Sequence, residues 1–374
     1  MRLNPLDGIL YLSMKMVKAF DRRDTDLKYF DPDKVKSILV VSSTAIGDTL
    51  LSTPAIKAVR ERYPDAKIIA HFNKSNIEMF ENNPHIDGVI SYYGGYKRFF
   101  TTIRELRKHK FDLVLIFHGN EPQATPMAYF SGANFIVKLP NTSKYGFLLS
   151  NTTSHLHPPT SDLQHGIEQR LKVAAVVGCN SKDKRMVLPI EKKDEDAIIK
   201  FLVSEGIKDN MLVGFQVGAS TVSRMWFADR FVELGKRLIS AYPDIRVVIT
   251  GSPSEREHCS KIAENIGRGA VVSAGRFPLR QVPALIKQFK VLVTGDTGIM
   301  HIAIAVGTSV VALYAVADFR RTGPYYDLEK HRVIQKWKTC APCVSKKCAY
   351  QKCMENINVD EVFNAVTDII GVRT

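Results

Sequence analysis

The residues from 294 to 301 read T-G-D-T-G-I-M-H and combine a glycine-rich turn with polar side chains. They follow an apolar run at 291–294 that predicts a strand, and they open a segment that predicts a helix. Backbone N–H groups at a helix N-terminus suit a diphosphate, and Asp296 is able to accept hydrogen bonds from sugar hydroxyls. A capped helix start with a buried histidine is the alternative. The combination favours a ligand site formed by Asp296, Thr297, Gly298 and His301.

Two further strand ends in the same half of the chain carry polar residues. Ser220 and Arg224 follow a predicted strand at 211–216, and Glu255 follows another at 246–250. A guanidinium suits a phosphate, and a carboxylate suits the hydroxyls of a ribose. Alone, Arg224 is equally compatible with an exposed loop, and Glu255 with the favourable first turn of a helix. Three such strand ends in one α/β domain indicate a nucleotide site.

In the first half of the chain, Asp48 follows the apolar run at 37–42 in the segment S-S-T-A-I-G-D. A carboxylate at the carboxyl end of a strand is able to act as a general base toward an acceptor hydroxyl. The alternative is an N-cap that stabilises the following helix. The segment lacks the G-x-G-x-x-G pattern, which argues against a dinucleotide oxidoreductase.

A basic segment with interleaved aromatic residues lies between 92 and 110. Lys97, Arg98 and Arg104 are its candidate contacts to acceptor phosphates or to lipid headgroups. Stacking of nucleic-acid bases and a solvated helix face are the alternatives.

Four cysteines near the C-terminus lie close enough in sequence to bind one metal ion. Their thiolates suit tetrahedral zinc or a single iron, although the segment lacks the glycines of a zinc knuckle, so a metal-free segment stays open. They are Cys340, Cys343, Cys348 and Cys353.

These residues require a scaffold of strands that alternate with helices, which predicts parallel βαβ units. Strands are predicted at 37–42, 67–72 and 113–117, and again at 211–216, 246–250, 270–272, 291–294 and 310–314. The polar stretch at 188–196 is predicted to be a linker. The domains expected are a lead segment (1–35), a first Rossmann-like domain (36–190), a second (195–340), and a cysteine-rich segment with a final helix (341–374).

The composition limits the partners. The chain of 374 residues has a net charge of +14, which indicates nucleic acid, an acidic membrane surface or a phosphorylated substrate. The sequence shows neither a membrane span nor a signal peptide, so a cytoplasmic protein is expected. Residues 6–20 predict a helix with a broad apolar face, which either lies in a membrane interface or packs on the first domain.

With these residues in place, the chain resembles the ADP-heptose:lipopolysaccharide heptosyltransferases, an inverting glycosyltransferase family. The resemblance rests on S-S-T-A-I-G-D, on G-A-S…R-M-W, and above all on D-T-G-I-M-H-I-A-I-A-V-G-T-S-V-V-A-L-Y. It implies an α/β protein of the GT-B fold, with two Rossmann-like domains whose parallel sheets face each other across a cleft. Acceptor and nucleotide sugar would bind to the first and second domain, respectively.

The resemblance also implies roles. Asp48 matches the general base; Asp296, Thr297, Gly298 and His301 match the donor motif, and Ser220 and Glu255 match other donor contacts. The family usually has lysine at Arg224 and proline at Phe227, which leaves the geometry of the phosphate contact open. We expect transfer of a heptose from ADP-heptose to a phosphorylated glycolipid such as a lipopolysaccharide core, without a required cofactor, on the inner face of the cytoplasmic membrane.

Other functions stay open at this stage. Some relatives with a metal-bound cysteine finger glycosylate proteins. The charge and the cysteines are compatible with a nucleic-acid-binding protein, although no recognition helix gathers the charge, so no nucleic acid is expected. A sugar-nucleotide epimerase and an inactive membrane-bound scaffold are further alternatives.

Overall fold

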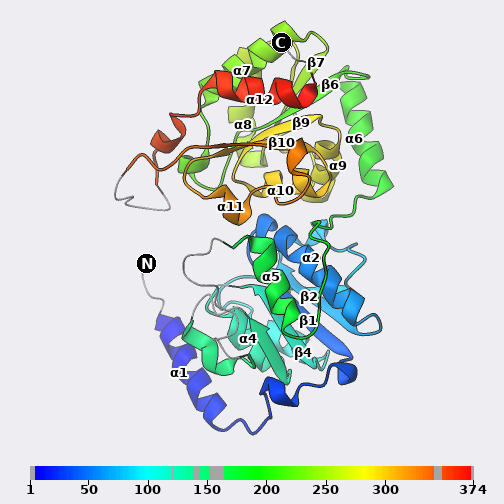
Figure 1. Cartoon of the computed structure of the whole chain (residues 1–374), viewed down its shortest axis with the longest axis vertical. Helices are drawn as coiled ribbons and strands as arrows, with labels where there is room; N and C mark the ends of the chain where they lie inside the picture. Colours follow the sequence, from blue (N-terminus) through cyan, green and yellow to red (C-terminus); the bar gives the residue numbers. More distant parts are fainter. Residues whose placement is uncertain (1–4, 120, 139–142, 152–163, 341–347, 372–374) are drawn as a thin grey trace. The chain divides into compact units, whose positions relative to one another are not determined.

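The computed structural model describes residues 5–119, 121–138, 143–151, 164–340 and 348–371. The chain divides into two compact units, unit 1 (Met1–Val187) and unit 2 (Leu188–Thr374). Each unit is built on a parallel sheet with helices on its faces (Figure 1).

Within its described residues, unit 1 contains a five-stranded sheet of order β3-β2-β1-β4-β5. The strands are β1 (Ser37–Ser42), β2 (Lys67–Asn73), β3 (Gly88–Tyr92), β4 (Leu113–His118) and β5 (Phe135–Lys138). The α-helices are α1 (Pro5–Ala19), α2 (Ile46–Arg62), α3 (Phe99–Arg107), α4 (Ala124–Phe130) and α5 (Gly166–Ala175). Every residue of β1 is buried, as expected for a central strand covered on both faces.

The described part of unit 2 contains a six-stranded sheet of order β11-β10-β9-β6-β7-β8. The strands are β6 (Met211–Gln216), β7 (Ile245–Thr250), β8 (Ala270–Val272), β9 (Val291–Gly295), β10 (Ser309–Tyr314) and β11 (Arg332–Gln335). The α-helices are α6 (Lys192–Ser204), α7 (Ala228–Ala241), α8 (Arg256–Ile266), α9 (Val282–Lys287), α10 (Gly298–Ala305), α11 (Phe319–Thr322) and α12 (Val359–Ile370).

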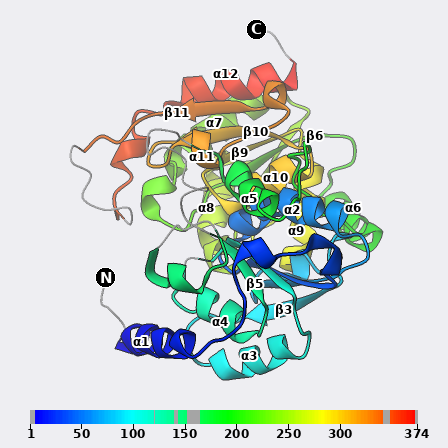
Figure 2. The ribbon, with the colours of Figure 1, turned by 60° about the horizontal axis from the view of Figure 1, so that its bottom comes forward.

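The C-terminal helix belongs to the core of unit 2. Val362 and Val366 of α12 are fully buried in the same apolar cluster as Phe215 of β6 and Leu234 of α7. The helix packs against α7 and against strands β9, β10 and β11 (Figure 2). Trp226 is also a core residue, and its indole N–H donates to Ile357 O at 2.9 Å.

The structure differs from the sequence prediction at several elements. Helix α6 begins at Lys192, inside the stretch predicted to be a linker, because its polar start precedes buried Ile198 and Leu202. Strands β3, β5 and β11 were not predicted. They are only four or five residues long, and β3 and β11 are edge strands with partly exposed side chains, so their apolar signal is weak.

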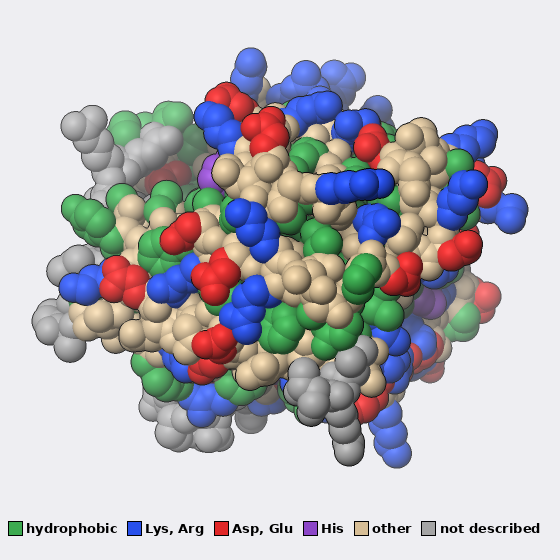
Figure 3. Space-filling model, turned by 90° about the horizontal axis from the view of Figure 1, so that it is seen from above, with side chains coloured by type: hydrophobic (Ala, Val, Ile, Leu, Met, Phe, Trp, Pro, Cys, Tyr) green, Lys and Arg blue, Asp and Glu red, His purple; other side chains and the backbone are tan. Residues whose placement is uncertain are grey.

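Two surface properties bear on the partners. None of the described helices is long and apolar enough to cross a membrane. On the face drawn in Figure 3, Lys and Arg side chains are spread out and mixed with Asp and Glu. That face therefore presents no single basic patch of the kind that nucleic acid requires.

We predict that His331→Asn weakens the pH dependence of the stability of unit 2. His331 Nδ1 accepts from Val310 N at 3.3 Å, and burial lowers the pKa of His331 from 6.5 to about 4. Between these values the unfolded chain binds a proton that the folded chain excludes, so stability falls as the pH drops. As the pH falls from 7 to 5, protonation of His331 in the unfolded chain should lower the free energy of unfolding by about 2 kcal/mol.

Urea unfolding followed by tryptophan fluorescence measures this change, because Trp226 and Trp337 both lie in unit 2. In His331→Asn, the free energy of unfolding should fall much less over the same pH range. An equal decrease in both proteins would contradict the prediction.

Candidate active site

Asp48 lies in the first turn of α2, directly beyond the carboxyl end of β1. The helix begins at Ile46, and its N-cap is Ala45, which makes no side-chain cap. Asp48 is therefore not the N-cap residue, which removes the structural alternative considered for it. Its side chain is 31 % exposed, so the carboxylate is held by the protein and remains accessible.

A buried arginine holds the Asp48 carboxylate. Arg170 of α5 is only 3 % exposed, and its Nη2 donates to Asp48 Oδ1 at 3.1 Å. The guanidinium is fixed further by Ser52 Oγ at 3.0 Å and Gly166 O at 2.8 Å. Burial lowers the pKa of Arg170, and the Asp48 charge opposes that shift. The pair places a compensated carboxylate at the edge of the sheet.

Thr44 and His118 complete the surroundings of Asp48. Thr44 Oγ1 donates to Asp48 Oδ2 at 2.9 Å and lies 2.7 Å from His118 Nδ1. His118 ends β4, which pairs with β1, and its Nε2 lies 3.4 Å from Asp48 Oδ1. Burial lowers the pKa of His118 to about 4; Arg170 and Lys138 lower it further, while Asp48 raises it. The imidazole is therefore neutral near pH 7.

The hydrogen bonds of Thr44 determine which nitrogen of His118 carries the proton. Because the Thr44 hydroxyl gives its hydrogen to Asp48, it accepts from His118 Nδ1–H. The lone pair of Nε2 then faces Asp48 Oδ1. A proton taken up by Asp48 finds a second acceptor there, so this arrangement suits a general base.

Basic residues lie on the same edge of the sheet. Lys138 ends β5, is buried, and donates to Gly119 O at 2.7 Å; burial lowers its pKa to about 8. Lys97 and Arg98 precede α3 at the end of β3, two strands from β1, and Arg104 lies within α3. All three side chains are exposed. Lys97 and Arg98 lie beyond the same end of the sheet as Asp48, whose described contacts are with Thr44, His118 and Arg170.

In unit 2, the predicted donor residues lie at the carboxyl ends of β6, β7 and β9. Arg224 Nη1 pairs with Asp296 Oδ2 at 3.3 Å. Asp296 Oδ1 also accepts from Tyr314 and Thr322, each at 3.4 Å. Among the described residues, Arg224 Nε is buried without a hydrogen-bond partner, so one N–H of this cation is left for a ligand.

Helix α10 starts next to this pair. Thr297 is its N-cap, and its Oγ1 accepts from Met300 N at 3.4 Å. The first N–H groups of α10 thus lie beside Arg224 and Asp296, a combination that suits an anion. His301 is buried in α10, which agrees with the alternative of a capped helix start with a buried histidine.

Glu255 lies against the backbone at the end of β6. A Cβ added to Gly218 would lie 1.7 Å from Glu255 Oε1, so any larger residue would push the Glu255 carboxylate aside. The other carboxylate oxygen accepts from Ser252 N and Ser252 Oγ at 2.7 and 2.8 Å. Ser220 lies in the loop after β6, and its side chain is exposed.

A largely apolar cavity of about 460 Å³ adjoins Glu255. It opens at the carboxyl ends of β6, β7 and β8, and its polar residues include Gln216 and Ser273. Its apolar lining suits a flat ring such as a nucleotide base. The lining includes Pro253, Phe277, Leu279, Val282, Leu285 and Ile299.

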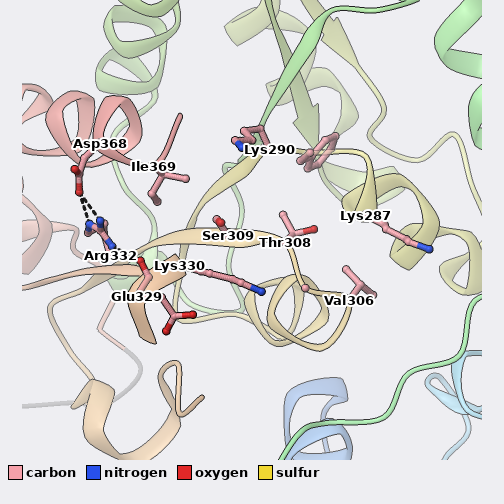
Figure 4. Close-up of a pocket in the computed structure, with 12 residues that line it drawn as sticks. Lys287, Lys290, Val306, Thr308, Ser309, Glu329, Lys330, Arg332, Asp368 and Ile369 are labelled. Carbon is pink, nitrogen blue, oxygen red and sulfur yellow. Dashed lines mark hydrogen bonds and ion pairs between the residues drawn. The ribbon is translucent and has the colours of Figure 1, made fainter. Parts of the chain in front are cut away.

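A second cavity of about 480 Å³ lies at the opposite edge of the same sheet (Figure 4). Lys290, Ser309 and Arg332 line it where β9, β10 and β11 begin. Arg332 is paired with Asp368, and Lys287 is paired with Glu195. The cavity lies at the amino ends of the strands, so it is separate from the donor residues.

The structure describes three of the four cysteines that were predicted to bind a metal ion. Cys340 is exposed, Cys348 and Cys353 are partly buried, and Cys343 lies outside the described residues. Within the described ranges, no group of three or more potential metal ligands is assembled. The four-cysteine metal site therefore stays a prediction.

Sequence reasoning missed His118, Arg170 and Lys138. His118 and Lys138 each end a strand, so the rule that identified Asp48 would have found them if β4 had been extended by one residue and β5 predicted. Arg170 lies in a helix 122 residues from Asp48, and no local pattern connects the two.

These two Rossmann-like units, with polar sites at the carboxyl ends of their strands, are typical of nucleotide-sugar transferases. Residues 99–354 match the family described as "Glycosyltransferase family 9 (heptosyltransferase)", and the chain belongs to this family. It is therefore a glycosyltransferase, as predicted. This assignment disfavours the nucleic-acid-binding, epimerase and scaffold alternatives.

Similar proteins support the assignment. Lipooligosaccharide heptosyltransferase 2 of Campylobacter jejuni is 23 % identical over 340 residues, which cover 89 % of this chain and 98 % of the relative. A family 9 glycosyl transferase structure from Veillonella parvula has a TM-score of 0.75 at 21 % identity, over 90 % of this chain and 97 % of that one. The structure of Escherichia coli ADP-heptose lipopolysaccharide heptosyltransferase II has a TM-score of 0.72 at 21 % identity, over 89 % of this chain and 98 % of that one. The predicted GT-B fold class is confirmed.

We predict that Asp48→Asn destabilises unit 1 by about 3 kcal/mol, because it leaves the buried Arg170 charge without its carboxylate. The double variant Asp48→Asn/Arg170→Met should recover most of this loss. Asp183→Asn, which breaks the more exposed pair with Lys57, should cost less than about 1 kcal/mol. Differential scanning calorimetry measures all three; a double variant no more stable than Asp48→Asn would contradict the pairing.

Proposed function

We propose that the protein transfers a heptose from ADP-heptose to a phosphorylated glycolipid acceptor of the lipopolysaccharide core type, with inversion at the anomeric carbon. The names of the similar proteins support the substrate classes. The observation that carries the chemistry is the Asp48 carboxylate, which Arg170 and Thr44 hold at an accessible strand end.

Asp48 is the proposed general base. It takes the proton of an acceptor hydroxyl while the oxygen attacks the anomeric carbon, and the bond from that carbon to the diphosphate breaks with its electron pair leaving on ADP. The charge of Arg170 keeps Asp48 ionised before the reaction. His118 Nε2 then lies where it shares the captured proton. One displacement from the opposite face inverts the configuration.

Unit 2 supplies the proposed donor site. The cavity beside Glu255 receives the base, and Glu255 receives the ribose hydroxyls. The first N–H groups of α10 and the Arg224 guanidinium meet the negative charge that develops on the diphosphate. These groups stabilise the leaving group without a metal ion, so the proposed mechanism assigns no step to one.

Unit 1 supplies the proposed acceptor site. In this proposal Lys97 and Arg98, beyond the end of β3, and Arg104 of α3 meet the phosphates of the acceptor. Because nucleotide sugars are cytoplasmic metabolites and the acceptor is a lipid, we place the reaction on the cytoplasmic face of the inner membrane.

We predict that Asp48→Ala reduces kcat with ADP-heptose and heptose-deficient lipopolysaccharide by at least about 10³-fold, because the proton acceptor is lost. The Kd for ADP, measured by isothermal titration calorimetry with EDTA present, should stay within about twofold. A parallel loss of ADP affinity would contradict the base assignment, and tighter binding of UDP or GDP by the wild-type protein would contradict the donor.

We predict that Gly218→Ala raises the Kd for ADP by about tenfold or more, because its Cβ displaces Glu255 and a hydrogen bond to a charged group contributes about 1.5–3 kcal/mol. Glu255→Ala should produce a similar loss. If Gly218 acts through Glu255, the double variant should bind ADP no more weakly than Glu255→Ala alone. Additive losses in the calorimeter would show that the two residues act independently.

A further inference from the structure

Helix α1 presents an apolar face to solvent. Ile9, Leu12 and Met16 are 61–66 % exposed, and Phe20, just beyond the helix, is 83 % exposed. Leu6 and Val17 are partly exposed on the same side. At 100° per residue these side chains cover one continuous face, interrupted only by Ser13. An apolar stripe of this length on a surface helix marks an interaction site.

The opposite face fixes α1 on unit 1. Leu10 and Met14 are buried in the core cluster of the unit. Asp7 accepts from Tyr96 OH at 2.5 Å, and the Tyr11 ring packs on Tyr145 with centroids 5.8 Å apart. The core thus uses two buried apolar residues of the helix. The exposed stripe is held outward by these contacts and is not part of the fold.

Phe100, the second residue of α3, is a further exposed apolar side chain of unit 1. It is 82 % exposed, and its ring packs edge-on against buried Phe99. Tyr96 links the two elements, because it contacts Phe99 on one side and Asp7 of α1 on the other. Figure 2 shows α1 and α3 at the same end of unit 1.

Cations border this surface, and two of the acids near them, Asp7 and Asp21, are engaged by other side chains. Lys15, Arg22, Lys97 and Arg98 are exposed beside the apolar side chains in α1 and α3. Asp7 accepts from Tyr96, and Asp21 is bound by Arg23 and Tyr129, whose hydrogen bonds hold the pKa of that carboxyl well below its usual range although burial opposes them. Asp24 is also exposed near Arg22, but the four exposed cations outnumber it, so the border is positive on balance.

From this surface we infer that unit 1 docks on an anionic lipid bilayer through the outward face of α1 and Phe100. An apolar stripe bordered by Lys and Arg fits the boundary between acyl chains and negative headgroups. The helix has 15 residues, too few to span a bilayer, so it lies along the surface. The docking contact uses residues outside the proposed acceptor and donor sites, except Lys97 and Arg98 at its border.

Vesicle co-sedimentation of the full chain tests this inference. The wild-type protein should bind vesicles of phosphatidylcholine with 30 % phosphatidylglycerol and should bind pure phosphatidylcholine at least about tenfold more weakly. Ile9→Gln/Leu12→Gln/Met16→Gln should lower the partition coefficient at least about tenfold, because three apolar side chains lose their burial. Lys15→Gln/Arg22→Gln should weaken binding to the anionic vesicles alone.

The matched control is Ile199→Gln/Val203→Gln/Leu328→Gln, which removes three exposed apolar side chains from unit 2 and should bind as the wild type does. Transfer to a soluble, deacylated acceptor should be unchanged in the α1 triple variant, so a failure of the proposed transferase activity would be seen separately. Unchanged vesicle binding by the triple variant would overturn the inference. Light scattering that shows a wild-type dimer and a monomeric triple variant would also overturn it, since a second copy would then cover the face.

Discussion

The ion pair between Asp48 and Arg170 is the interaction on which the proposed chemistry depends. A guanidinium that is only 3 % exposed requires a counter-charge, and the fold provides it at the carboxyl end of the central strand. The same cation favours the ionised form of the carboxylate, which stays 31 % exposed. Thr44 and His118 fix its orientation from the neighbouring turn and strand, so three elements hold the proposed base at the carboxyl ends of the strands.

The charged groups of the two units differ: unit 1 surrounds a carboxylate, and unit 2 presents a cation and a helix N-terminus. Unit 1 holds the proposed base, Asp48, and surrounds it with one buried cation and a neutral imidazole. For the diphosphate of the proposed donor, unit 2 offers a helix start and the Arg224 cation beside Asp296. Asp296 is engaged by Arg224, Tyr314 and Thr322, so in the structure it orients the cation, and its contact with a sugar hydroxyl stays a prediction.

The features predicted correctly from the sequence are those that a short run of residues encodes. Buried strands such as β1 and β6 are continuous apolar runs, and Asp48 and Asp296 follow such runs directly. The short edge strands β3 and β11 lack that signal. Arg170 could not be assigned, because its role arises from packing between elements distant in the chain, whereas His118 was missed because the predicted strand ended one residue too early. The apolar residues of α1 were visible in the sequence, but only the structure shows that Leu10 and Met14 face the core while Ile9, Leu12 and Met16 face solvent.

The most direct test of this account is the pH dependence of kcat/KM for the wild-type protein and for Arg170→Gln, which keeps an N–H donor for Asp48 but removes the charge. Loss of the cation raises the pKa of the base, so the acidic limb of the profile should move to higher pH by about one unit or more. An acidic limb at the same pH in both proteins would show that Arg170 does not set the ionisation of the catalytic base, and it would contradict the central claim.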